Sequence, residues 1–142
     1  MGAYLGKGGE KAQYFYQFGE ALGMAYQIRD DILGIWGVKE STGKSIEEDL
    51  RQRKKTLPVV YALGESKDKT ELKRLYSQRH IERGDIPILV GILDQSGARD
   101  HAQNLVQQCC RRALEQLEAS GLGRDRQAPL KQITHFLAER NY

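Results

Sequence analysis

Two adjacent carboxylates and a glutamine stand close together on one predicted helix of this chain, and two lysines follow shortly after it. The carboxylates are Asp30 and Asp31, the amide is Gln27, and the lysines are Lys44 and Lys54. Residues three and four apart are neighbours on one face of a helix, so Gln27 is expected beside both aspartates. Carboxylates bind hard cations such as Mg²⁺, and lysines bind phosphate as point charges. Together these five residues have the chemistry of a magnesium–diphosphate site.

Spacing alone leaves ordinary explanations open. Two adjacent aspartates on a helix are more often solvated surface acids, or partners for Arg29 and Lys44, than metal ligands. A third acid one turn later would make the pattern more specific, but position 34 is Gly34. In favour of a site, an acidic pair is costly on so apolar a helix unless it lines a polar cavity, pairs with a cation or binds metal. Lys54 also precedes a predicted helix start, where backbone donors suit an anion, although a single lysine ordinarily faces solvent.

A long helix, Glu10–Trp36, is the element expected to carry the acidic pair. It is apolar over much of its circumference, which is typical of a helix at the centre of a bundle. Gly19 and Gly23 share one face at four-residue spacing, so a neighbouring helix or a substrate can approach the backbone closely there. Helix packing is the commoner reason for such a pair. We expect the acidic pair, near the C-terminal end of this helix, to face a polar cleft.

The rest of the chain is also predicted to be helical, because strand-like alternation is absent and the sequence has only three prolines. Thr56 is expected to cap a helix that has Pro58 in its first turn and ends near Gly64. A capping box of Ser45 and Glu48 is expected to open a short helix before it. The other predicted helical segments are 1–5, 68–78, 85–93, 98–119 and 129–140.

Composition indicates a single soluble domain of ordinary character. The chain has 142 residues, of which 39% are hydrophobic and 29% charged, and its net charge of +3 gives no basic footprint for nucleic acid. No signal-peptide pattern and no bilayer-spanning apolar run is present. The only cysteines, Cys109 and Cys110, are adjacent on a predicted helix and point in different directions, which argues against a disulfide or zinc site. We therefore expect a cytoplasmic protein without nucleic-acid partners or stable membrane insertion.

Five short segments around the acidic pair follow one another in a distinctive order. They are Tyr26-Gln27, Asp30-Asp31, Gly43-Lys44, Asp49-Leu50 and Lys54-Lys55-Thr56-Leu57-Pro58. This series resembles the second aspartate-rich region of the trans-isoprenyl diphosphate synthases (polyprenyl synthetases), where a Phe-Gln pair, an acidic motif, a Gly-Lys, an Asp-Leu and a Lys-x-Thr-Leu-Pro occur in that order. Residues 2–3 and 18–23 also look like the family. The likeness is most specific from Phe18 to Pro58 and weaker through the C-terminal helices.

The resemblance implies an all-α helical bundle and a role for each candidate residue. It implies that Asp30 and Asp31 bind Mg²⁺ that bridges an allylic diphosphate. It implies that Lys44 and Lys54 bind that diphosphate, and that Gln27 lines the pocket. The implied reaction condenses isopentenyl diphosphate with the allylic diphosphate, and metal ions and cations stabilise the departing diphosphate.

Two departures from the family pattern limit what is expected of this chain alone. Gly34 stands where the acidic motif has its last aspartate. No first aspartate-rich motif is present, although in the family that motif lies on a facing helix and completes the metal cluster. We therefore expect residues 1–142 to be a single partial domain, the C-terminal half of the isoprenoid synthase fold, and inactive alone. A homodimer, or an N-terminal half supplied in trans, would cover the long helix. Two other functions remain open for the chain: a non-catalytic partner subunit of a prenyl diphosphate synthase, and a plain helical interaction module without a ligand.

Overall fold

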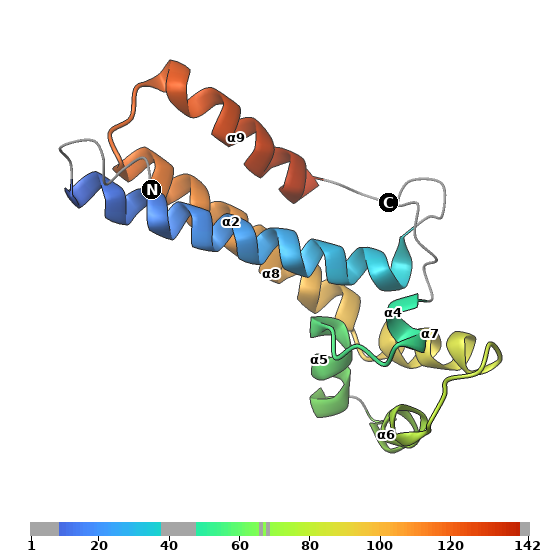
Figure 1. The fold of residues 1–142 in the computed structure, drawn as a ribbon. Coiled ribbons are helices and arrows are strands. Elements are labelled where there is room, and N and C mark those ends of the chain that lie inside the picture. Colours follow the sequence, from blue (N-terminus) through green and yellow to red (C-terminus); the bar gives the residue numbers. More distant parts are fainter. Residues whose placement is uncertain (1–8, 38–47, 66, 68, 140–142) are drawn as a thin grey trace. The chain divides into compact units, whose positions relative to one another are not determined.

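The computed structural model describes residues 9–37, 48–65, 67 and 69–139, and every regular element in those residues is a helix, as predicted. The chain divides into two compact units, the first formed by residues up to 27 and from 105 onward, the second essentially by residues 28–104. None of the described helices has the length and apolar character needed to cross a membrane. The helices are α2 (Gly9–Trp36), α4 (Glu48–Arg51), α5 (Leu57–Glu65), α6 (Lys69–Ser77), α7 (Asp85–Gln95), α8 (Ala98–Ala119) and α9 (Arg124–Glu139) (Figure 1).

Most predicted helix boundaries agree with the structure. The long helix α2 covers the predicted segment with one further residue at its start, and α8 has its predicted ends. Gly121 follows α8 with a φ of 65°, the left-handed conformation that suits glycine after a helix. The predicted helix at residues 1–5 and the predicted cap Ser45 lie outside the described residues.

A small apolar cluster joins α2, α8 and α9 in the first unit. A hydrogen bond of 2.7 Å from Gln107 Nε2 to the Ala138 carbonyl also links α8 to α9. The ion pair between Arg112 and Glu20 is long, at 3.9 Å, and exposed, so it adds little stability. The buried members of the cluster are Phe18, Ala21, Ala113 and Leu117, with Phe15, Leu22, Leu122 and Leu130 packed against them.

Helix α9 begins at Arg124 rather than at Pro129, so the predicted start was wrong. The amide of Gln127 donates to the Gly123 carbonyl at 3.0 Å, and its side-chain Nε2 donates to the Leu122 carbonyl at 2.6 Å. These bonds fix the first turn ahead of the proline. Pro129 therefore lies inside the helix, although its ring nitrogen cannot donate to the preceding turn.

The exposed face of α2 carries large apolar side chains. Tyr16, Met24 and Tyr26 are 63%, 54% and 64% exposed. A β-carbon added at Gly19 or Gly23 would meet no described atom within 4 Å. Helix packing therefore does not explain this glycine pair within the described residues. The described helices thus leave part of α2 open, as expected for a central helix that has only half of a bundle around it.

The second unit contains the larger apolar core. Helices α5, α6 and α7 pack against one another, and α4 packs on α7. The C-terminal end of α2 joins this core through Ile35. Trp36 Nε1 donates to Asp94 Oδ1 at 2.8 Å, and the Arg99 guanidinium lies over the Trp36 ring at 5.7 Å from its centre, within cation–π range. The end of α2 that carries the acidic pair is thus fixed by side-chain contacts within its own unit. The side chains that are 0% exposed in this core are Val59, Ala62, Leu72, Leu75, Leu89, Leu93 and Ala98.

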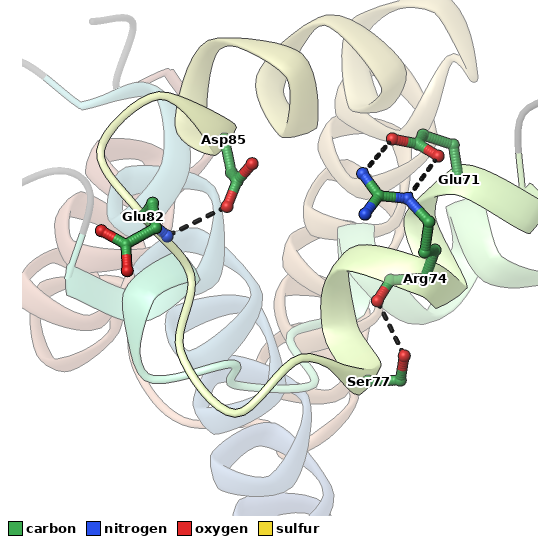
Figure 2. A network of polar contacts seen from close by, with 5 residues as sticks. All are labelled: Glu71, Arg74, Ser77, Glu82 and Asp85. Atoms are coloured by element: carbon green, nitrogen blue, oxygen red, sulfur yellow. Dashed lines mark hydrogen bonds and ion pairs between the residues drawn. The ribbon is translucent and has the colours of Figure 1, made fainter.

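A polar network orders the segment from α6 to α7 (Figure 2). The Arg74 guanidinium donates two hydrogen bonds to the Glu71 carboxylate, at 2.8 and 2.6 Å. Ser77 Oγ donates to the Arg74 carbonyl at 2.7 Å, and the Glu82 amide donates to Asp85 Oδ2 at 3.0 Å. The bonds of Glu71, Arg74 and Ser77 lie within α6, and the bond of Glu82 lies at the start of α7. Two further contacts from the end of α6 reach the candidate site.

Candidate diphosphate and metal site

Asp31 caps helix α5. Its Oδ2 accepts a hydrogen bond of 2.9 Å from the amide of Leu57, the first residue of α5. A carboxylate at a helix N-terminus also interacts favourably with the helix dipole. Thr56 stands at the predicted N-cap position, but its hydroxyl is buried without a hydrogen-bond partner among the described residues, so the side chain does not make the capping bond. The Thr56 backbone does hold the N-cap place, since its carbonyl accepts the Val60 amide at 3.0 Å. The side chain that accepts a hydrogen bond at the start of α5 is therefore Asp31 of α2 and not the adjacent Thr56.

The other candidates from the sequence are placed as follows. Asp30 is exposed, whereas Asp31 is partly buried, so the two carboxylates have different surroundings. Gln27 lies on α2 one turn before them and is also exposed. Lys44 lies outside the described residues. Of the two predicted lysines, only Lys54 can therefore be placed against the carboxylates.

Lys54 ends a Schellman turn that closes α4. The Lys54 amide donates to the Asp49 carbonyl at 3.0 Å, and the Arg53 amide donates to the Leu50 carbonyl at 2.9 Å, the two backbone bonds of that motif. The left-handed residue is Arg53, with a φ of 53°, where glycine is usual. The turn brings Lys54 back toward Asp49, and Lys54 Nζ donates to Asp49 Oδ1.

Two contacts from the end of α6 hold this turn. Arg53 Nη1 donates to the Gln78 carbonyl at 2.7 Å, and the Tyr76 hydroxyl donates to the Lys54 carbonyl at 3.4 Å. Burial raises the pKa of Tyr76 above its ordinary value, and the charge of Asp49 raises it further. The phenol is therefore a proton donor at neutral pH.

Lys54 lies within electrostatic reach of the acidic pair. The hydrogen bond to Asp49 raises the pKa of Lys54 above its ordinary value, and the charges of Asp49, Asp30 and Asp31 also raise it. The lysine is thus a permanent cation at neutral pH. The Lys54 side chain contacts Asp49 of α4 directly, whereas Asp30 and Asp31 of α2 act on it through their charge.

Gly34 has no room for a side chain. A β-carbon at this position would lie 2.9 Å from Asp49 Cγ and closer still to Asp49 Oδ2. Sequence reasoning did not assign Asp49 a role in the site. The signals that could have found it were the Asp49-Leu50 pair in the motif order and the missing carboxylate at Gly34.

The oxygen donors of this site are a partial fit to magnesium. Mg²⁺ is usually bound by one or two protein carboxylates, with water and phosphate oxygens completing its octahedral shell. Asp30 and Asp31 are of that donor type. Across the residues that the structure describes, no group of three or more His, Cys, Asp or Glu side chains is placed to hold a metal ion. The remaining ligands would therefore come from water, from a diphosphate or from a partner.

The polyprenyl synthetase family model matches residues 1–93 of this chain. Heptaprenyl diphosphate synthase component 2 of Bacillus subtilis (strain 168) is 32% identical over 143 residues, which is 100% of this chain and 40% of that protein. The match to it extends through the C-terminal helices, beyond the part that the family model covers.

Solved structures of prenyl synthases are similar to this chain. A polyprenyl synthetase from Streptomyces coelicolor A3(2) has a TM-score of 0.85 and 28% identity over 93% of this chain and 41% of its own. Geranylgeranyl pyrophosphate synthase from Corynebacterium glutamicum, complexed with calcium and isoprenyl diphosphate, has a TM-score of 0.75 and 28% identity over 89% of this chain and 39% of its own. The chain therefore spans about two fifths of these proteins.

Proposed function

We propose, since this chain belongs to the polyprenyl synthetase family, that it is part of a prenyltransferase that condenses isopentenyl diphosphate with an allylic diphosphate. Residues 1–142 would be a single partial domain, the C-terminal half of that enzyme. The observation that carries the proposal is the contact of Lys54 with Asp49, five residues before it, together with the hydrogen bond from the Leu57 amide, three residues after it, to Asp31. The reduced thiols of Cys109 and Cys110 suit a cytoplasmic enzyme.

Each candidate residue then has a defined task. Asp30 and Asp31 hold Mg²⁺, and Lys44 and Lys54 bind the diphosphate of the allylic substrate. Gln27 lines the pocket one turn earlier on the same helix. Bound magnesium would neutralise negative charge on the departing diphosphate. Lys54 adds a cation that is fixed in place before substrate binds, which lowers the reorganisation needed during the reaction.

The chain alone provides one side of such a site. Catalysis requires groups held in productive geometry around both substrates, and these residues address only one diphosphate. We propose that a second copy of this chain, or an N-terminal half supplied in trans, provides the rest. The name of the Bacillus subtilis relative, component 2, supports an assembly of more than one component. The second candidate function is a non-catalytic partner subunit, and the retained Asp30-Asp31 pair speaks against it.

Calorimetric titration with inorganic pyrophosphate, with and without magnesium, tests the site. We expect weak binding that requires magnesium and is lost in Asp30→Asn. The matched control is Asp100→Asn, which neutralises an exposed aspartate of α8. Equal binding by the two variants would refute the site.

An activity assay tests the division of labour between chains. The pure chain is incubated with an allylic diphosphate, labelled isopentenyl diphosphate and magnesium. We expect no longer prenyl product. Robust elongation by the chain alone would show that its helices complete the site without a partner.

A further inference from the structure

We propose that Gly34 and Asp49 are a matched pair that positions Lys54. The bare backbone at Gly34 leaves the space that the Asp49 carboxylate occupies, and that carboxylate holds the Lys54 ammonium. Asp49 is in this view a positioning residue, and Gly34 is the residue that allows it to act. The contribution of this pair to diphosphate binding rests on the proposed function. The packing of Asp49 over Gly34 and its contact with Lys54 do not depend on that function.

The contact with Gly34 is close enough to exclude other residues. A β-carbon at position 34 would lie 3.3 Å from Asp49 Cβ and 2.9 Å from Asp49 Cγ. Rotation about χ1 of Asp49 can move Cγ and the carboxylate away, but Cβ is fixed to the backbone of α4 and its 3.3 Å contact leaves little spare room. Alanine at position 34 should therefore displace Asp49, and aspartate should displace it further.

The backbone holds Asp49 and Lys54 together before their side chains meet. The Lys54 amide already donates to the Asp49 carbonyl at 3.0 Å, and the Tyr76 hydroxyl donates to the Lys54 carbonyl. A lysine side chain has four flexible bonds, so an unheld Lys54 would spread over many rotamers. The bond from Nζ to Asp49 Oδ1 selects among them. In that position the negative charges of Asp30 and Asp31 also raise the pKa of the Lys54 ammonium.

The pair also accounts for the acid that the helix lacks. Four residues after Asp30, α2 carries Gly34 instead of a third carboxylate. The Asp49 carboxylate lies over that position but comes from α4. Asp49 thus supplies a negative charge beside α2, and its carboxylate is bonded to Lys54. An aspartate at position 34 and an aspartate at position 49 would compete for one volume.

A double-mutant cycle in thermal unfolding tests the packing. Gly34→Ala should lower the unfolding temperature in the native chain, because the new methyl group displaces Asp49. In an Asp49→Ala background the same change should raise it, because alanine favours a helix over glycine and the obstacle is gone. Gly23→Ala is the matched control, since a β-carbon there meets no described atom within 4 Å, and it should raise the unfolding temperature in both backgrounds. The same sign for Gly34→Ala in both backgrounds would overturn the proposal.

Lysine reactivity tests the positioning itself. Acylation at mildly alkaline pH, followed by mass spectrometry, should modify Lys54 severalfold faster in Asp49→Asn than in the native chain, because the hydrogen bond to the Asp49 carboxylate both holds the ammonium and raises the pKa of Lys54. Lys55 is the internal reference, because it is exposed and adjacent, and its rate should not change. An unchanged Lys54 rate would refute the role of Asp49.

Binding of magnesium pyrophosphate separates this inference from the proposed function. We expect affinity to fall about tenfold in Asp49→Asn, the effect of one charge-assisted contact, and to recover in part in Asp49→Glu. One outcome is that the double-mutant cycle and the Lys54 acylation rates behave as expected but pyrophosphate does not bind. In that case the positioning of Lys54 by Gly34 and Asp49 is supported and the proposed function is refuted. If pyrophosphate binds equally to the native chain and Asp49→Asn, the positioning inference fails and the proposed function stands.

Discussion

Replacing Asp31 by alanine should lower the free energy of unfolding by about 1–2 kcal/mol. The change removes the acceptor of the 2.9 Å hydrogen bond from the Leu57 amide, at the partly buried start of α5. A hydrogen bond to a charged group contributes about 1.5–3 kcal/mol, and a capping side chain about 0.5–2 kcal/mol. Alanine has a helix propensity roughly 0.5–0.7 kcal/mol more favourable than aspartate within α2, and this gain partly offsets the loss of the hydrogen bond.

Thermal and urea unfolding followed by far-UV circular dichroism measure this loss. For a chain of this size, 1 kcal/mol corresponds to a shift of roughly 3–5 °C in the unfolding temperature. Asp30→Ala is the matched control, because Asp30 is exposed one residue away on the same helix, and it should change stability by less than about 0.5 kcal/mol. Asp31→Asn should be milder than Asp31→Ala, since an amide oxygen can still accept the bond. Equal losses for Asp30→Ala and Asp31→Ala would refute the capping role.

Three further predictions concern the core, the alkaline limit of stability and assembly. Leu89→Ala should cost about 2–5 kcal/mol in urea unfolding because Leu89 is 0% exposed, whereas Ile88→Ala, at a 48% exposed position, should cost far less; equal costs would contradict the assigned core. The raised pKa of Tyr76 means that its contribution to stability is full below pH 10 and is lost as the pH rises toward the folded-state pKa, with a slope of at most about 1.4 kcal/mol per pH unit. Tyr76→Phe should flatten that slope in alkaline urea titrations, and an unchanged slope would argue against burial of the phenol. Sedimentation equilibrium at micromolar concentration should show self-association, because burying the apolar face of α2 is worth about 25 cal/mol per Å²; a concentration-independent monomer would mean that this face is already covered.

Periodicity and motif order were enough to predict the parts of the fold that depend on local sequence. The extent of α2 and α8 follows from their apolar spacing and from the glycine after α8. The grouping of Lys54 with the acidic pair in one site came from the order of the motif segments, and it stays a prediction.

The parts that sequence could not predict are those where a distant group outcompetes a local one. Thr56 has the side chain of an N-cap, but the carboxylate of Asp31 reaches the Leu57 amide instead, and nothing local to Thr56 signals this. Pro129 looks like a helix start, yet the contacts of Gln127 begin α9 earlier. The space over Gly34 is filled by the Asp49 side chain from α4. The glycine in the sequence shows that a side chain is missing there but not which residue fills the space.

The packing of α4, α5, α6 and α7 bears on the order in which the chain folds. Helices α5, α6 and α7 follow one another directly in the sequence and contact one another, so their association closes shorter segments than the contact of α4 with α7 does. Short loops carry a small closure entropy, and proteins rich in such contacts fold in microseconds to milliseconds. The bond from Leu57 to Asp31 must close a longer segment. We therefore expect the core of α5, α6 and α7 to form first, and the carboxylates of α2 to reach their lysine only after that core gives them a surface to dock on.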